Sequence, residues 1–433
     1  MPSREAHGGR ASLWSACAVA LVTSAFGAWG EDWPQWRGPG RDGVWSTTGF
    51  VAEPQASLVR IRWRTPVGFG FASPVVAEGK IFLPDLQLDR VASHERVVCY
   101  DETTGRSVWS QVYEVKPPEW AFTPGQETGP NATPIVEDGR LFAIGWHGHL
   151  HCLETGRGEV VWRRDLAHDY PDAELRTTAS PLVEGGLLIL VIGGKPDACV
   201  LALDKETGRE VWKALGEGAG YSSPIITQVG GTRQLIVWTI ASVTSLDPAS
   251  GQRLWRVPIA TPADMVVSTP VCQDDRLLIG GMMFRLAGDP PSATLLWPKE
   301  AKPTARVLSV TSTAFLTGGH LYSPRLNGEL VCLEADTGRE VWRTNSVTDL
   351  KPGASVHITP TGNSALLFTD RGELLQARLS PAGYQELARA TLVAPVTPFG
   401  GRNVAWAPPA FANGCAFVRT ARELVCASLA LRP

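Results

Sequence analysis

The most concentrated group of chemically active side chains in the sequence is the run His147-Gly-His149-Leu-His151. Residues two apart on a β-strand point to the same side, so His149 and His151 could present two imidazoles to one metal ion. Zinc would need three or four such ligands. However, His147 aligns with Asn327, which begins a hairpin turn in a later repeat, and His151 aligns with Val331, a packing position. We therefore predict no metal site and keep His147, His149 and His151 as its only candidates.

A second set of polar side chains precedes or begins successive predicted strands. If those strands surround one axis, their first residues face a common channel, where convergent hydrogen bonds could hold a ligand. The set is Asn131, Thr178, Tyr221, Ser222, Ser268, Ser312 and His357. Arg325, Arg371 and Arg402 would add positive charge to the same face, which suits a carboxylate-bearing ligand. A water-filled channel is the alternative interpretation.

A repeat positions these residues. Each unit opens with a Ser/Thr-Pro or similar step and closes with a turn and a tryptophan, as in Thr207-Gly-Arg-Glu-Val-Trp212. The openings are Ser73-Pro74, Thr133-Pro134, Ser180-Pro181, Ser223-Pro224, Thr269-Pro270, Thr313-Ala314, Thr359-Pro360 and Pro408-Pro409. A unit of roughly 40–50 residues built from short strands is typical of a β-propeller.

The two ends of the chain fix the predicted number of blades. The last repeat supplies only three strands, whereas Leu58–Arg64 reads as a fourth strand without partners of its own. Pairing these segments would remove two open sheet edges. We therefore predict an all-β fold, an eight-bladed β-propeller of four-stranded antiparallel blades closed by the N-terminal strand. The predicted boundaries are a signal peptide at 1–30, an N-terminal extension at 31–57 and the propeller at 58–433.

The recurring tryptophans and glycines are predicted to be structural. A tryptophan side chain buries ~150–250 Å² and its indole N–H needs a partner, so we expect each ring between neighbouring blades near a turn backbone. Glycine suits turn positions that a Cβ would disfavour. These residues are Trp63, Trp109, Trp162, Trp212, Trp255, Trp342, Gly105, Gly208, Gly251 and Gly338.

Two insertions depart from the repeat, at residues 87–95 and 115–131. The first widens the connection between the second and third strands of blade one, and the second joins blades one and two. Both kinds of connection emerge on the same face of a propeller, and long loops are where function concentrates. Trp36, Trp120 and Phe122 lie outside repeat positions, so they either anchor a partner or cover the propeller.

The N-terminal residues predict export. Arg4 and Arg10 precede an apolar stretch at 13–28 that ends in Ala28-Trp29-Gly30, the pattern of a secretory signal. A retained membrane anchor and lipidation at Cys17 are the alternatives. The formal charge of −3 gives no electrostatic footprint for nucleic acid. We expect a monomer in the periplasm or cell envelope, without a transmembrane span after removal of the signal.

The units at Thr207–Trp212 and Thr337–Trp342 resemble the repeat of the pyrroloquinoline-quinone (PQQ) propeller superfamily. That superfamily includes quinoprotein alcohol dehydrogenases and a non-catalytic lipoprotein of outer-membrane β-barrel assembly. The opening Asp32-Trp-Pro-Gln-Trp-Arg-Gly-Pro39 resembles the start of many exported bacterial PQQ-repeat proteins. The resemblance to the dehydrogenases implies PQQ, Ca²⁺ and, in many of them, two adjacent bonded cysteines, but this sequence has no Cys-Cys pair.

We therefore expect no cofactor and no catalytic residues, and a protein that serves as a protein-binding scaffold with cell-envelope proteins as partners. A PQQ-dependent oxidoreductase with Ca²⁺ and a carbohydrate- or peptide-binding propeller are the alternatives.

Overall fold

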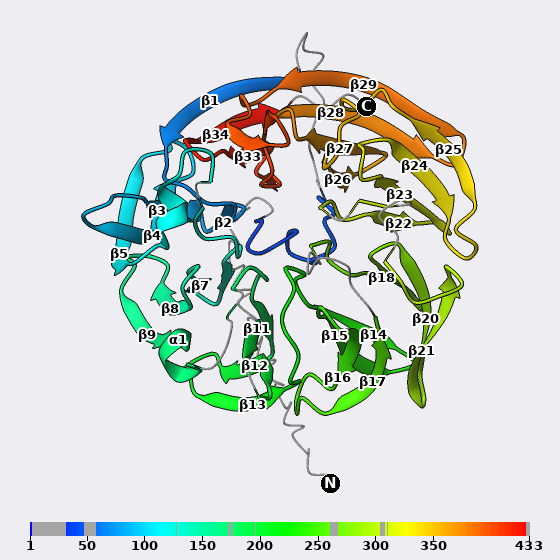
Figure 1. The fold of residues 1–433 in the computed structure, drawn as a ribbon, viewed down its shortest axis with the longest axis horizontal. Coiled ribbons are helices and arrows are strands. Elements are labelled where there is room, and N and C mark those ends of the chain that lie inside the picture. Colours follow the sequence, from blue (N-terminus) through cyan, green and yellow to red (C-terminus); the bar gives the residue numbers. More distant parts are fainter. Residues whose placement is uncertain are drawn as a thin grey trace.

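The computed structural model describes residue 1 and residues 32–46, 58–126, 128–171, 175, 177–194, 196–259, 267–303, 308–309 and 311–429. These residues form eight four-stranded antiparallel sheets arranged around one axis, which confirms the predicted propeller (Figure 1). Within each blade, strands A to D run from the central channel outward. Apart from residue 1, the predicted signal segment lies outside the described residues.

Blades 1 to 4 follow one another along the chain. Blade 1 is β2 (Val75–Ala77), β3 (Lys80–Gln87), β4 (Ser93–Asp101) and β5 (Ser107–Val115). Blade 2 is β6 (Ile135–Glu137), β7 (Arg140–Ile144), β8 (His149–Glu154) and β9 (Val160–Asp165). Blade 3 is β10 (Leu182–Glu184), β11 (Leu187–Gly194), β12 (Ala198–Asp204) and β13 (Glu210–Ala214). Blade 4 is β14 (Ile225–Val229), β15 (Thr232–Trp238), β16 (Ser242–Leu246) and β17 (Arg253–Pro258).

Blades 5 to 7 continue the series, and blade 8 joins both ends of the propeller. Blade 5 is β18 (Val271–Gln273), β19 (Arg276–Ile279), β20 (Met282–Gly288) and β21 (Pro291–Trp297). Blade 6 is β22 (Phe315–Thr317), β23 (His320–Pro324), β24 (Leu330–Glu334) and β25 (Glu340–Thr344). Blade 7 is β26 (Val356–Thr361), β27 (Ser364–Thr369), β28 (Glu373–Ser380) and β29 (Gly383–Thr391). Blade 8 is β32 (Ala410–Ala412), β33 (Cys415–Arg419), β34 (Glu423–Leu429) and β1 (Val59–Pro66).

Three short elements lie in the connections. They are the 3-10 helix η1 (Glu119–Phe122), the helix α1 (Leu166–Asp169) and the hairpin of β30 (Thr397–Phe399) with β31 (Arg402–Val404). Among the described residues, no helix has the length and apolar character needed to cross a membrane.

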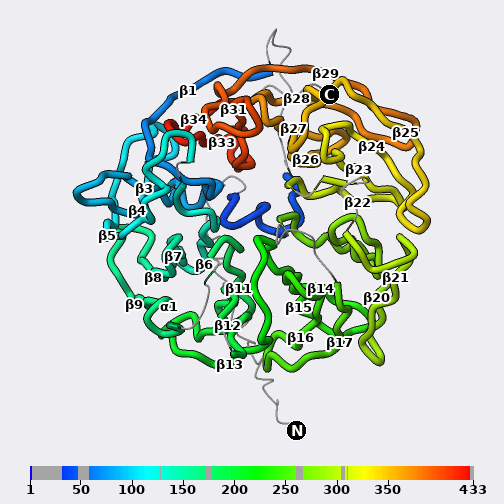
Figure 2. The backbone as a smooth tube through the Cα atoms, in the orientation of Figure 1, coloured from blue at the N-terminus to red at the C-terminus, as the bar shows by residue number. Residues whose placement is uncertain are grey.

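The closing strand pairs as the sequence predicts. Strand β1 runs antiparallel to β34, with Trp63 opposite Cys426 and Pro66 opposite Glu423. Figure 2 shows this first strand beside the last one at the rim of the ring. The pairing gives blade 8 four strands, like the other blades, and so closes the ring.

Tryptophans join neighbouring blades. The indole N–H of Trp63 donates to the carbonyl of Glu102 in blade 1 at 3.0 Å, and that of Trp109 donates to Thr155 in blade 2 at the same distance. The same contact to the next blade is made by Trp162, Trp212, Trp297 and Trp342. Trp255 differs, because its indole donates to Gln234 of its own blade. The predicted packing between blades is thus confirmed, and Trp255 shares it, because it lies in one buried cluster with Leu277 and Phe284 of blade 5; only its hydrogen bond stays within blade 4.

The turn glycines provide the surfaces on which these rings lie. Gly105 has a φ of +68°, and a Cβ there would come within 2.5 Å of the Trp63 ring. Gly208, Gly251 and Gly338 have φ values of +68° to +71° and meet the tryptophan of the preceding blade in the same way. Glycine is needed here for its backbone conformation and for the close approach of the indole.

The Ser/Thr-Pro steps link four pairs of neighbouring blades by hydrogen bonds around the channel. The backbone N–H of Ser73 donates to the Thr133 hydroxyl, that of Thr133 to Ser180, and that of Ser180 to Ser223. Thr269 and Thr313 make the same contact between blades 5 and 6. The hydroxyl therefore bridges blades at a position where the strand has no neighbour on its inner side.

Blade 7 departs from the predicted opening. We expected Thr359-Pro360 there, but Thr361 pairs with Ser364 as Ala77 pairs with Lys80 in blade 1. This register places His357, two residues earlier, at the position of Ser73. The dipeptide Thr-Pro was a misleading signal because it lies in the middle of β26.

Candidate functional site: the central channel and the loop face

The central channel is crossed by the protein's own N-terminal segment, residues 32–46, which we call the channel segment. In Figure 1 it is the dark blue chain in the middle of the ring. Trp33 pairs with Val76 of β2 through two backbone hydrogen bonds, and the carbonyl of Pro34 accepts the N–H of Val136 in β6. At the other end, the N–H of Trp45 donates to the carbonyl of Pro360 in β26. The segment thus adds backbone pairing to the inner strands of three blades.

Side chains of the channel segment reach four further blades. Arg41 donates to the carbonyls of Ser180 and Pro181 in blade 3 and of Pro224 in blade 4, at 2.8 to 2.9 Å. The Trp36 indole donates to the Thr269 hydroxyl of blade 5 at 2.8 Å. The ring of Trp45 stacks on Phe411 of blade 8, with ring centres 5.5 Å apart. These backbone and side-chain contacts join the segment to at least seven of the eight blades.

The buried arginine is held without a carboxylate among these contacts. Arg41 is 8% exposed and also donates to the amide oxygen of Gln35. Burial, followed by the nearby positive charge of Arg37, lowers its pKa to about 9. The guanidinium remains charged at neutral pH, and backbone carbonyl dipoles compensate its charge.

Several of the polar channel candidates make hydrogen bonds between neighbouring blades. Ser222 donates to the carbonyl of Ser268, and Ser312 accepts the N–H of Val356. The Nε2 of His357 lies 2.9 Å from the carbonyl of Trp406, and burial lowers the pKa of His357 to about 4. Asn131 and Thr178 are half-buried, and Tyr221 is 36% exposed. Their role in binding a ligand stays a prediction.

The three arginines expected to supply free positive charge are paired with acids. Arg402 contacts Asp370, and Arg371 contacts Asp349 at 2.8 Å. Arg325 contacts both Glu329 and Glu340. The local acids therefore neutralise the charge that we expected to attract a carboxylate.

The three histidines lie between blades 1 and 2, beside a buried acid. His149 and His151 both face Tyr113 of β5, with ring centres 5.2 and 4.6 Å apart, so they do lie on one side of the strand. Glu95 is fully buried and accepts hydrogen bonds from the Tyr113 hydroxyl and the backbone N–H of Trp146.

His147 completes this group from the hairpin before β8. Its Nδ1 lies 3.6 Å from Glu95. Burial, followed by the charge of His149, lowers the pKa of His151 to about 4, so this ring is neutral at pH 7. Within the described parts of the chain, no three His, Cys, Asp or Glu side chains are grouped closely enough to hold a metal ion.

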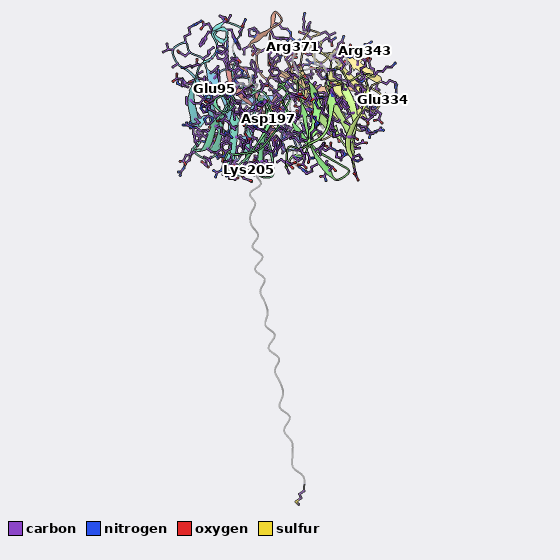
Figure 3. All side chains as sticks on the ribbon, turned by 60° about the horizontal axis from the view of Figure 1, so that its bottom comes forward. Glu95, Asp197, Lys205, Glu334, Arg343 and Arg371 are labelled. Carbon is purple, nitrogen blue, oxygen red and sulfur yellow. The ribbon has the colours of Figure 1, made fainter. Side chains whose placement is uncertain are left out.

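Both predicted insertions lie on the same face, and they touch. Arg90 in the β3–β4 hairpin pairs with Glu119 in the next insertion at 2.7 Å, and its guanidinium lies 4.8 Å from the centre of the Phe122 ring. The hairpins between strands B and C and the connections from D to A form this side of the disc, which we call the loop face. In Figure 3, Arg371 of the loop face and Lys205 of a turn on the opposite face lie on opposite sides of the disc.

The loop face exposes large apolar side chains. Val91 is 94% exposed, Trp120 48%, Leu350 44%, Phe399 37% and Tyr221 36%, and each lies on one of its connections. Trp120 meets Trp146 edge to face, with ring centres 5.6 Å apart. Aromatic residues held in this way are typical anchors of protein–protein contacts. Trp36, in contrast, is in the channel.

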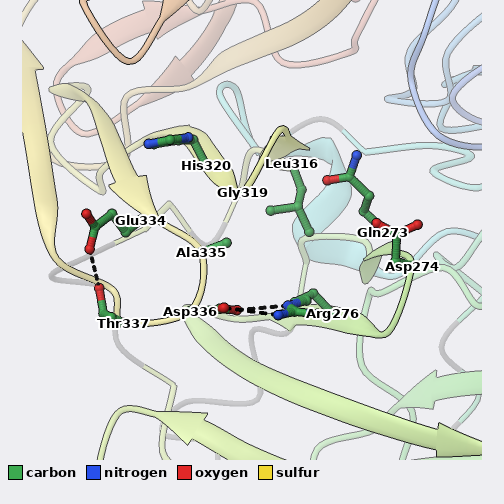
Figure 4. Close-up of a pocket in the computed structure, with 10 residues that line it drawn as sticks. All are labelled: Gln273, Asp274, Arg276, Leu316, Gly319, His320, Glu334, Ala335, Asp336 and Thr337. Carbon is green, nitrogen blue, oxygen red and sulfur yellow. Dashed lines mark hydrogen bonds and ion pairs between the residues drawn. The ribbon is translucent and has the colours of Figure 1, made fainter.

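A separate hollow of about 370 Å³ opens between blades 5 and 6 on the opposite face. Figure 4 shows Arg276 paired with Asp336 across it, and Glu334 bonded to Thr337. The charged groups that line it are thus largely occupied with one another.

A family model described as outer membrane protein assembly factor BamB matches residues 93–287 and 283–427. The chain belongs to this family. It is 23% identical over 274 residues to outer membrane protein assembly factor BamB of Shewanella oneidensis, covering 59% of this chain and 66% of the relative. It is also 25% identical over 217 residues to quinoprotein ethanol dehydrogenase of Pseudomonas aeruginosa, covering 43% of this chain and 34% of that enzyme.

Solved structures share the propeller fold. BamB from Moraxella catarrhalis has a TM-score of 0.58 at 13% identity, covering 87% of this chain and 99% of that one. Quinohemoprotein alcohol dehydrogenase from Comamonas testosteroni has a TM-score of 0.66 at 15% identity, covering 93% and 81%. The matches span 66% of BamB of Shewanella oneidensis, 54% of BamB of Alteromonas naphthalenivorans and about a third of the quinoprotein.

The residues of the channel do not fit a PQQ and calcium site. The channel segment occupies the axis, and the Ser/Thr hydroxyls of the inner strands bond to neighbouring blades. Sequence reasoning missed Arg41 and Glu95, which hold the segment and the first blade interface. Glu95 was expected at the end of the first insertion, but it lies inside β4, so no sequence signal marked it as a buried acid.

Proposed function

We propose that this protein is an exported, non-catalytic propeller that binds protein partners in the cell envelope and acts with outer membrane protein assembly proteins. The observation that carries the proposal is the channel segment. Because residues 32–46 bond to the inner strands of the ring, the surface left for a partner is the outside of the disc. Membership of the BamB family supports the same class of partner.

The loop face is the surface that we assign to the partner. It carries both insertions and the exposed aromatic residues Trp120 and Phe399, whose rings are braced by Trp146 and Trp406. Braced aromatic rings lose little side-chain entropy on binding, so they contribute strongly to a protein interface.

Cross-linking followed by affinity purification from bacteria that produce the protein tests this assignment. We expect outer membrane assembly proteins to co-purify with the wild type, and the double variant Trp120→Ala/Phe399→Ala to recover at least about tenfold less, since two hot-spot residues are removed. Val211→Ala is the matched control, because Val211 is 52% exposed on the outer strand of blade 3. Equal recovery by both variants, or recovery of no assembly protein by the wild type, would refute the proposal.

A quinoprotein-like oxidoreductase is the second candidate, favoured by the 25% identity to quinoprotein ethanol dehydrogenase. It would require PQQ to bind outside the axis or to displace the channel segment.

A further inference from the structure

A small cavity of about 30 Å³ lies where the channel segment meets the inner strands of blades 1, 6, 7 and 8. Its polar lining comes from Arg37, Ser73, Thr313, His357 and Thr359. A single water needs ~10–15 Å³ measured in this way, so the cavity has room for a small ion and one water but not for an organic cofactor.

The cavity has a positive lining. No Asp or Glu is among its lining residues, although the charge of Asp42 nearby raises the pKa of Arg37 and so partly offsets the effect of burial. The Arg37 guanidinium donates to the backbone carbonyl of Asp42, and burial lowers the pKa of Arg37 to about 10, so it stays charged at neutral pH. His357 is neutral there because burial lowers its pKa to about 4. The buried guanidinium of Arg41 is close enough for the charge of Arg37 to lower its pKa.

Two buried donors on the lining residues have no partner among the described residues. They are the Nε of Arg37 and the hydroxyl of Ser73, whose side chain is 3% exposed. Buried donors are normally satisfied, because leaving one without an acceptor costs free energy. The site is also shaped for the guanidinium, since a Cβ at Gly43 would come within 2.7 Å of Arg37 Nη2 and the φ of Gly43 is +82°.

We propose that this cavity binds one small monovalent anion, a halide or the carboxylate of a formate-sized acid, between Arg37 Nε and Ser73 Oγ. Such an anion accepts both unpaired donors and offsets the Arg37 charge. It bridges the channel segment to blade 1, and the site is independent of the partner assigned to the loop face.

Bromide diffraction tests the position of the ion. Crystals of the full chain grown in sodium bromide are expected to show an anomalous peak in the cavity, within hydrogen-bonding distance of Arg37 Nε and Ser73 Oγ. The peak should disappear in Arg37→Gln and persist in the control Arg343→Gln, whose side chain is 60% exposed. Bromide at surface positions only, an adventitious ion, would overturn the proposal.

Chloride NMR line widths test affinity in solution and do not depend on the Arg37 variant folding. Ser73→Ala keeps both arginines. We expect about tenfold weaker excess broadening of the ³⁵Cl line in this variant, because it loses one hydrogen bond to a charged group. Displacement by formate assigns a carboxylate-accepting site, whereas displacement by bromide alone assigns a halide site. Equal broadening by wild type and Ser73→Ala would contradict the proposal.

Discussion

At the scale of single residues, a tryptophan of one blade and a glycine of the next form the joint between blades. The indole N–H satisfies a turn carbonyl, and the ring lies on a glycine that has no Cβ to hold it away. Both requirements follow from the sequence spacing, so these residues could be predicted. Trp255 differs in its hydrogen bond only, because the turn between strands C and D of blade 5 runs through Asp289-Pro290 without such a glycine, and the indole donates to Gln234 instead.

The steric part of this joint can be measured with two glycines of equal backbone conformation. Gly105 and Gly79 have φ of +68° and +70°, but only Gly105 touches an indole, whereas nothing lies within 4 Å of a Cβ at Gly79. Gly79→Ala should lose about 1 kcal/mol for its positive φ. Gly105→Ala should lose about 1–3 kcal/mol more through overpacking. Urea unfolding of both variants checks this, and equal losses would show that the Trp63 contact is not tight.

The buried histidine beside Tyr113 predicts acid sensitivity. The pKa of His151 is about 4 in the folded state, below its unfolded value of 6.5, so the unfolded chain binds more protons between these pH values. The contribution of neutral His151 to the free energy of unfolding is fully present above pH 6.5. It is lost as the pH falls towards 4, which lowers the stability by about 1–3 kcal/mol. His151→Phe keeps the ring contact without titrating, so its stability should fall less between pH 7 and 4. Parallel pH profiles of thermal unfolding in wild type and variant would rule out this origin.

At the scale of elements, the closing strand explains an irregularity of the repeat. Strand D of blade 8 comes from β1, so blade 8 has no turn between strands C and D. A tryptophan in strand D of blade 7 would therefore have no turn of blade 8 to contact. Blade 7 has Ala388 at the tryptophan position, opposite Gln376. The number of blades and this closure could be predicted from the repeat. The register of β26 could not be predicted, because Thr359-Pro360 lies within this strand and not just before its first residue, as in the other blades.

A disulfide across the closing pair tests how much this strand contributes. Arg60 lies directly opposite Ser428, and such pairs have Cα atoms about 4.5–5.5 Å apart, within the range a disulfide spans. The double variant Arg60→Cys/Ser428→Cys, when oxidised, should gain about 2–4 kcal/mol by restricting the unfolded chain. The reduced protein is the control, and no gain on oxidation would mean that β1 does not limit unfolding.

At the scale of the whole molecule, the ring is closed twice, by β1 at the rim and by residues 32–46 in the channel. The second closure was beyond sequence reasoning, because the segment has no repeat position and its Arg41 bonds to backbone carbonyls far away in the chain. Two of the polar channel candidates, Ser222 and Ser312, bond to neighbouring blades. A filled axis moves the expected binding surface to the loop face.

The most direct test of this account is a titration of the purified full chain with PQQ and Ca²⁺, following quinone absorbance and dye-linked alcohol oxidation together. A propeller whose channel is filled by its own residues 32–46 should show neither saturable binding nor turnover. Stoichiometric, saturable PQQ binding accompanied by alcohol oxidation would contradict the account.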